Sequence, residues 1–148
     1  MKADPKIDSA LHILKGAVQT VLNATLTTNV YGEGNKGRLT VEFGEKPTDS
    51  QMEEIEKLAN NKIKENVPIE MFEIDRKEAE KKHGNIIYDK FPVPTSIQRL
   101  TLTQIKNWNI NCCLGPHVKT TGEVLQIKIL THRARPNRKE LEISFEVC

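Results

Sequence analysis

Hydrophobic residues recur at helical spacing along the first part of the chain, over residues 5–22, where Ala10, Leu14 and Val18 share one face. A second helical pattern opens at Thr48, which has a glutamine three positions later as in a capping box, and continues to about residue 65. A third and more charged helix is predicted to start after Asp75 and to stop at Gly84.

Alternating apolar and polar residues predict β-strands in the rest of the chain. A glycine-rich turn at residues 32–37 and a Pro136-Asn137 turn each join two of these strands. Strands that meet through hairpins, with helices between them, indicate an α+β fold. We therefore expect a single domain over residues 1–148, in which a mainly antiparallel sheet packs against helices. The predicted strands are residues 26–30, 38–43, 69–74, 99–105, 124–133 and 141–147.

Composition and charge narrow the class of protein. The chain has 148 residues, of which 37% are hydrophobic and 28% are charged, as in an ordinary globular domain. A net charge of +2 excludes a strongly basic coat for nucleic acid but permits a local basic patch. The three cysteines are a poor disulfide framework, and no apolar run has the length of a membrane span. We therefore expect a cytoplasmic protein with no membrane partner.

Two short segments carry residues that can bind a metal. Asp8 and His12 are four positions apart on the first predicted helix, so they share a face, and Cys113 and His117 flank a Gly-Pro loop. Carboxylate, imidazole and thiolate are all ligands of zinc. The alternative is that Asp8 caps a helix and that His12 and Cys113 only pack. His12 lies beside an apolar stripe, where an unpaired imidazole would be costly.

Four segments of the chain together resemble a known family. The sequences DSALHILKGAVQTVL, GNKG, YDKFPVP and CLGPHVKTTGE are similar to those of the AlaX alanyl-tRNA-editing hydrolases, in the same order along nearly the whole chain. These enzymes are relatives of the editing domains of alanyl- and threonyl-tRNA synthetases, and the length of the chain resembles the short form of the family.

The resemblance implies one zinc ion bound by a His-x-x-x-His and a Cys-x-x-x-His motif. His12 matches the second histidine of the first motif, and Cys113 and His117 match the second motif. Asp8 stands where the family has its first histidine. The implied catalytic residues are His12, Cys113 and His117, and the implied metal ligands are Asp8, His12, Cys113 and His117.

The implied activity is hydrolysis of the amino acid from mischarged tRNA(Ala), preferentially seryl-tRNA(Ala). A pocket for alanine discriminates poorly against serine, so a second site that hydrolyses the error is the usual remedy. Thr27 matches the family's threonine near the amino-acid side chain; the alternative is a β-branched residue that merely suits a strand. Thr120, Thr121 and Gly122 can line the pocket, or they can form a polar turn.

Basic residues are the candidates for contact with tRNA phosphates, although basic hairpins are usually only solvated. We expect no DNA partner, and the sequence does not indicate an oligomeric state. Trp108 and Tyr88 can stack on the terminal adenosine or pack in the core. The candidate tRNA-binding residues are Lys36, Lys119, Arg133 and Arg135, with His132, Arg138 and Lys139 beside them.

Other functions fit the same residues. Asp8 can mark the loss of the metal site in a catalytically impaired tRNA-binding or regulatory module. A hydrolase of related fold can act on another mischarged tRNA, such as seryl-tRNA(Thr). A purely structural zinc domain would lose its fold when the metal is removed, whereas the editing enzyme would lose its activity and keep its fold.

Overall fold

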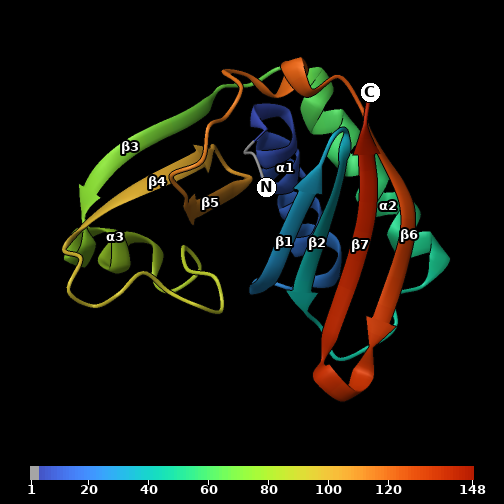
Figure 1. The fold of residues 1–148 in the computed structure, drawn as a ribbon, viewed down its shortest axis with the longest axis horizontal. Helices are drawn as coiled ribbons and strands as arrows, with labels where there is room; N and C mark the ends of the chain where they lie inside the picture. Colours follow the sequence, from blue (N-terminus) through green and yellow to red (C-terminus); the bar gives the residue numbers. More distant parts are fainter. Residues whose placement is uncertain (1–3) are drawn as a thin grey trace.

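The computed structural model describes residues 4–148, and it contains two antiparallel sheets rather than the one sheet expected from the sequence (Figure 1). The larger sheet has the strand order β1-β2-β7-β6, and the smaller has the order β3-β4-β5. The α+β class is confirmed. The larger sheet is formed by β1 (Thr27–Glu33), β2 (Lys36–Glu42), β6 (Ile127–Arg135) and β7 (Glu140–Val147), and the smaller by β3 (Ile69–Asp75), β4 (Arg99–Ile105) and β5 (Asn109–Cys112).

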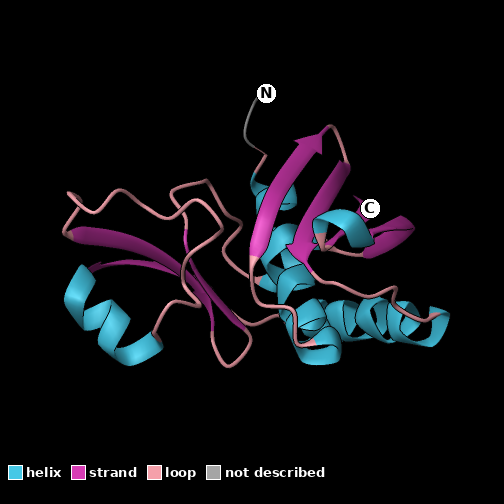
Figure 2. Cartoon of the chain, turned by 90° about the horizontal axis from the view of Figure 1, so that it is seen from below, coloured by secondary structure: helices cyan, strands magenta, loops and turns pink. Residues whose placement is uncertain are grey.

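The predicted helices are all present. Helix α1 (Pro5–Leu22) and helix α2 (Asp49–Glu65) pack together and cover the larger sheet, whereas α3 (Arg76–His83) lies on the smaller one (Figure 2). The Thr48 capping box forms as predicted, but the side chain of Asp75 makes no capping hydrogen bond. None of the helices in residues 4–148 is both long and apolar enough to cross a membrane.

The start of one predicted strand was wrong, and another strand was missed. The strand expected at 124–133 begins only at Ile127, because Thr121–Val124 form a 3-10 turn and Leu125 has a positive φ of 75°. Strand β5 was not predicted, because its four residues, Asn109–Cys112, are too few for their alternation to indicate a strand. They are recruited by pairing with β4, where Leu102 lies opposite Cys112.

Each sheet has its own hydrophobic core. The larger core joins α1 and α2 to the larger sheet, and the smaller core gathers residues of α3 and the three-stranded sheet around Ile87. Helix α1 contacts β1, β2 and β7 on one side and β5 on the other. Side chains of α1 therefore meet residues from both sheets, and the candidate site lies at this junction.

Candidate metal centre and adjoining pocket

The first turns of α1 place His12 in the interior. The Asp4 carboxylate caps the helix by accepting a hydrogen bond from the backbone N–H of Lys6 at 2.8 Å. His12 is only 8% exposed. The side chain of Ser9, one turn earlier, accepts a 2.9 Å hydrogen bond from the backbone N–H of Val118. Helix α1 is therefore tied directly to the segment that carries His117.

The loop after β5 brings Cys113 and His117 to the same place. Its start is fixed to β4, because the N–H of Cys113 donates to the carbonyl of Thr101 at 3.2 Å and the hydroxyl of Thr103 donates to the carbonyl of Cys113 at 3.3 Å. The Sγ of Cys113 lies 3.6 Å from the Nε2 of His117. The rings of His12 and His117 have centroids 4.9 Å apart.

These three side chains form a group that can hold a metal ion. One ligand atom from each of His12, Cys113 and His117 lies within 4.8 Å of the other two, and this is the only such group of three or more found in residues 4–148. Two imidazoles and a thiolate are a donor set that zinc accepts in catalytic sites. Three of the four sequence-predicted ligands thus lie close together, and Asp8 is the one outside the group.

Asn109, which the sequence analysis did not single out, orients His12. Its side-chain oxygen lies 3.0 Å from the Nδ1 of His12, and its amide nitrogen donates to Gln19 at 3.3 Å. Because Asn109 uses its N–H on Gln19, its oxygen is left to accept from His12 Nδ1–H. The Nε2 lone pair of His12 is therefore free for a metal ion, which is the arrangement that orients histidine ligands in metalloproteins.

Burial sets the protonation of the candidate ligands. Burial, followed by the nearby charge of His117, lowers the pKa of His12 to about 4, while the hydrogen bond with Asn109 opposes the shift. Burial also lowers the pKa of His117, so both imidazoles are neutral at pH 7 and can act as ligands. Burial raises the pKa of Cys113, with a hydrogen bond from the Gly115 backbone opposing it. A bound metal ion would hold this thiol in its ionised form.

Asp8, the fourth predicted ligand, lies beside the group but outside it. Its carboxylate does not belong to the set within 4.8 Å. The carboxylate lies against Gly115, where an added Cβ would approach its Oδ2 to 2.8 Å. Burial, followed by the charge of Asp4, raises the pKa of Asp8. Gly115 therefore allows the loop to close over this carboxyl group.

A cavity of about 130 Å³ adjoins the metal-binding group. His12 and Cys113 form part of its wall, and Thr27 also lines it. Lys15 and Asp89, which the sequence analysis did not select, also line it. The sequence analysis did not distinguish these two residues from the many other lysines and acidic residues of the chain. The other lining residues are Asp8, Leu11, Val30, Leu39, Asn109, Asn111 and Cys112.

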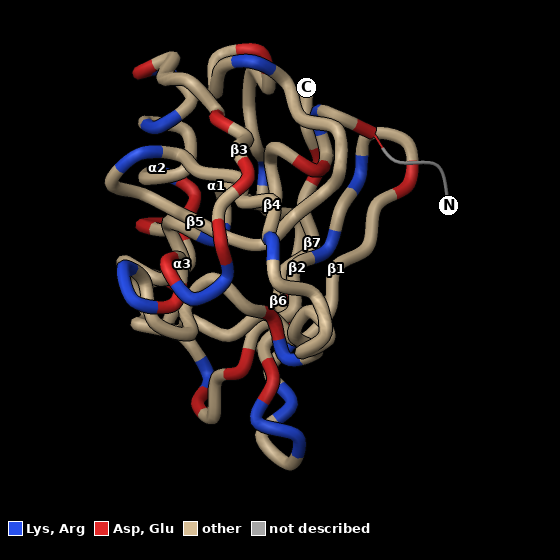
Figure 3. Tube along the Cα trace, turned by 90° about the vertical axis from the view of Figure 1, so that its left-hand side faces the viewer, with Lys and Arg blue, Asp and Glu red and all other residues tan. Residues whose placement is uncertain are grey.

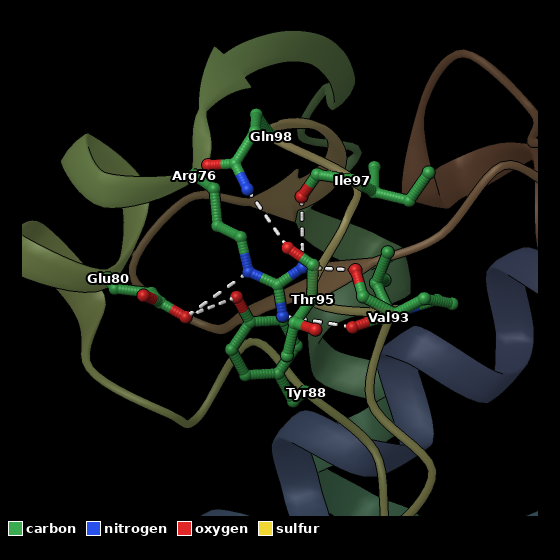
Figure 4. Close-up of polar contacts among 8 residues, drawn as sticks. Arg76, Glu80, Tyr88, Val93, Thr95, Ile97 and Gln98 are labelled. Atoms are coloured by element: carbon green, nitrogen blue, oxygen red, sulfur yellow. Dashed lines mark hydrogen bonds and ion pairs between the residues drawn. The ribbon is translucent and has the colours of Figure 1, made fainter.

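Arg76 holds the long loop that includes Asp89, and Figure 4 shows its contacts with Val93 and Ile97 of that loop. Its guanidinium donates to the carbonyls of Pro94, Ile97 and Val93 at 2.6, 2.9 and 2.9 Å, and it pairs with Glu80 at 3.5 Å. At the other end of the loop, the backbone N–H of Lys90 donates to the carbonyl of Thr27 at 2.9 Å. The loop is thereby held against β1.

Thr120, Thr121 and Gly122 do not line the cavity, contrary to the pocket-lining prediction. The buried hydroxyl of Thr121 donates to the carbonyl of Lys62 at 2.8 Å and accepts from the N–H of Val67 at 3.0 Å. The N–H of Gly122 donates to Asn66 at 3.1 Å. These residues satisfy the polar groups at the end of α2, so the alternative of a polar turn describes them.

The predicted tRNA-binding residues are dispersed. Lys36 lies opposite Glu146 at one end of the larger sheet, whereas Arg135 lies opposite Glu140 at the other. Figure 3 shows Lys and Arg segments at the tip of the β6–β7 hairpin. Arg135 is paired with Glu142 at 3.3 Å, whereas Lys36, Lys119 and Arg133 are exposed.

The two aromatic candidates pack rather than stand free. The indole N–H of Trp108 donates to the carbonyl of Ile13 at 2.9 Å, and the Tyr88 hydroxyl donates to Glu80 at 2.6 Å. Trp108 packs against the larger core, and Tyr88 belongs to the smaller one. Both residues therefore follow the core-packing alternative.

Comparison with known proteins finds relatives that are similar to this chain. Residues 100–144, which include Cys113 and His117, match the threonyl and alanyl tRNA synthetase second additional domain. The chain is 31% identical over 137 residues to the alanyl-tRNA editing protein AlaX-M of Methanosarcina acetivorans. The chain is related to the AlaX alanyl-tRNA editing proteins. The family resemblance predicted from the motifs is confirmed.

Alanine–tRNA ligases contain a related segment. The chain is 35% identical over 136 residues to the enzyme of Methanococcus aeolicus and 35% identical over 127 residues to that of Hyperthermus butylicus. These matches cover 90% and 82% of this chain. The chain spans 15% and 13% of the two ligases, and 55% of the AlaX-M protein although 90% of the chain matches.

Proposed function

We propose that this chain is a trans-editing hydrolase that removes the amino acid from mischarged tRNA(Ala), preferentially from seryl-tRNA(Ala), in the cytoplasm. The observation that carries the proposal is the group of His12, Cys113 and His117, of which His12 and Cys113 line a cavity of about 130 Å³ that Thr27 also lines. A metal-binding group beside a cavity of this size suits a small aminoacyl ester. The relation to an alanyl-tRNA editing protein supports the choice of tRNA.

One zinc ion is the cofactor that we propose for these ligands. Bound zinc would supply Lewis acidity and lower the pKa of a coordinated water to about 7. The protein supplies the orientation of His12 through Asn109 and the ionisable thiol of Cys113. His12, Cys113 and His117 would be its three protein ligands and would leave room for water or substrate.

The walls of the cavity would select the amino acid. Thr27 offers a hydroxyl within the cavity, and a serine side chain can pair with it. Alanine would leave the hydroxyl hydrogen of Thr27 without an acceptor, which costs about 1–3 kcal/mol. We therefore expect seryl-tRNA(Ala) to be deacylated faster than correctly charged alanyl-tRNA(Ala).

Deacylation of seryl-, glycyl- and alanyl-tRNA(Ala), together with the zinc content of the purified protein, tests this proposal. We expect about one zinc per chain and rapid loss of serine, both abolished in Cys113→Ala. Cys148→Ala is the matched control, because Cys148 is exposed and outside the group.

Three outcomes would contradict the proposal. Equal hydrolysis of seryl- and alanyl-tRNA(Ala) would exclude editing. Faster hydrolysis of seryl-tRNA(Thr) than of seryl-tRNA(Ala) would assign a different tRNA. Binding of tRNA without zinc or hydrolysis would instead identify an impaired binding module.

A further inference from the structure

Lys15 is a buried cation inside the proposed amino-acid pocket. It lies on α1, three residues after His12, and is only 6% exposed although lysine is rarely buried. Its Nζ donates a 2.5 Å hydrogen bond to the Oγ1 of Thr27, and both residues line the cavity. Neither the zinc ligands nor the packing of α1 requires an ammonium group at this position.

The contact between Lys15 and Thr27 restricts the hydroxyl of Thr27. An ammonium group has three donors and no acceptor, so the oxygen of Thr27 must be the acceptor in this bond. The hydroxyl hydrogen of Thr27 is then left to donate elsewhere. Within residues 4–148 the structure shows no protein acceptor for it, and the cavity is the space that Thr27 lines.

The surroundings keep Lys15 charged at neutral pH. Burial lowers its pKa to about 8, and the nearby carboxylate of Asp89 opposes this shift. Asp89 is itself held in place by the amide of Asn111, which donates to it at 3.2 Å. Because the pKa of Lys15 still lies above 7, the ammonium form predominates and the direction of its bond to Thr27 is fixed.

We propose that Lys15 is a positioning residue that turns the hydroxyl of Thr27 into a hydrogen-bond donor toward the substrate, so that the pocket selects an amino acid whose side chain carries an acceptor oxygen. The inference rests on the proposed editing function and deepens it. Lys15 does not touch the ester and acts through Thr27. Serine supplies the acceptor, whereas an ethyl side chain of almost the same size does not.

A comparison of two esters of tRNA(Ala) tests this inference. One carries serine, and the other carries 2-aminobutyrate, in which a methyl group replaces the serine hydroxyl. The wild-type protein is expected to hydrolyse the seryl ester about tenfold faster or more, because the 2-aminobutyryl ester leaves the hydroxyl hydrogen of Thr27 unpaired. Lys15→Met is expected to lower this preference by about tenfold.

Variants of neighbouring residues separate a positioning role from a structural one. Lys90→Met is the matched control, because Lys90 is exposed and only its backbone contacts Thr27. It should keep the serine preference. Thr27→Val should lose the preference to the same extent as Lys15→Met, and the double variant should lose no more, since both changes remove the same donor.

Lys15→Met leaves the carboxylate of Asp89 buried without its cation, so it can also destabilise the fold. If thermal unfolding shows that Lys15→Met is destabilised, the double variant Lys15→Met/Asp89→Asn removes both charges. The hydrolysis of the two esters is then compared in this double variant, with Asp89→Asn alone as the control. Equal hydrolysis of the two esters by the wild-type protein would overturn the inference. An unchanged serine preference in the variants that carry Lys15→Met would also overturn it. Failure of the wild-type protein to hydrolyse either ester would instead refute the proposed function.

Discussion

The Nδ1 of His12 and the side-chain oxygen of Asn109 lie 3.0 Å apart, although 97 positions separate the two residues in the chain. His12 belongs to α1 and Asn109 to β5, so this contact joins the helix to the smaller sheet. It also fixes which nitrogen of His12 faces Cys113 and His117. The geometry of the candidate metal centre therefore depends on the junction between the two sheets.

Asn109→Leu is expected to lower the affinity for zinc by about 10- to 100-fold, because His12 loses the acceptor that orients its ring. Asn109→Asp keeps an oxygen at the same place and should retain most of the affinity. Competition with a chromogenic chelator measures both variants. Equal affinities of Asn109→Leu and the wild-type protein would show that the contact does not orient the ligand.

Arg76→Met is expected to destabilise the protein by about 2–4 kcal/mol, because three loop carbonyls lose their donor. The arginine is 9% exposed and bonds to residues 93, 94 and 97. Urea denaturation measures the free energy of unfolding, and hydrogen exchange should rise over residues 85–98.

Arg99→Met is the control for this variant. Its side chain is 64% exposed, and its ion pair with Glu73 is long at 3.9 Å, so we expect a change of less than about 0.5 kcal/mol. Equal effects of the two substitutions would contradict the role assigned to Arg76.

Gly16→Ala is expected to destabilise the protein by about 1–3 kcal/mol through overpacking. A Cβ at Gly16 would overlap the indole ring of Trp108, which cannot move without losing its 2.9 Å bond to Ile13. This cost exceeds the gain of about 1 kcal/mol that alanine brings to a helix.

Thermal and urea unfolding measure the effect of Gly16→Ala, and Gly44→Ala is its control. A Cβ at Gly44 has its nearest neighbour at 3.9 Å, so this variant should remain close to wild type. A more stable Gly16→Ala protein would mean that Trp108 can be displaced without penalty.

The lowered pKa of Lys15 should make the free energy of unfolding depend on pH in the alkaline range. Its pKa is about 8 in the folded protein and near 10.5 in the unfolded chain, so the unfolded state binds more protons between these values. The contribution of Lys15 to the free energy of unfolding should therefore rise with pH above about 8, by about 1 kcal/mol between pH 7 and pH 9.

Urea denaturation of the wild-type protein and Lys15→Met at these two pH values measures that contribution. The comparison between the two proteins removes the opposite effect of Cys112, whose pKa burial raises to about 11. A difference between wild type and variant that stays constant with pH would contradict the burial of a charged lysine.

Local sequence determined the helices and the two segments that carry the candidate metal ligands. The apolar spacing of α1 and the capping box of α2 act within a few residues, so their patterns are complete in the sequence. The motif around Cys113 and His117 is local in the same way. His12, Cys113 and His117 could therefore be named from the chain alone, with the help of the family resemblance.

Tertiary structure decided what surrounds these ligands. Asn109, Lys15 and Asp89 carry ordinary polar or charged side chains, and only contacts between distant segments bury them in one cavity. The division of the strands into two sheets, and the separation of Lys36 from Arg135, depend on which strands pair. Strand pairing joins distant segments and is not specified by the alternation of residues within one strand. The sequence therefore indicated the candidate ligands, whereas the tertiary structure determined which residues surround them.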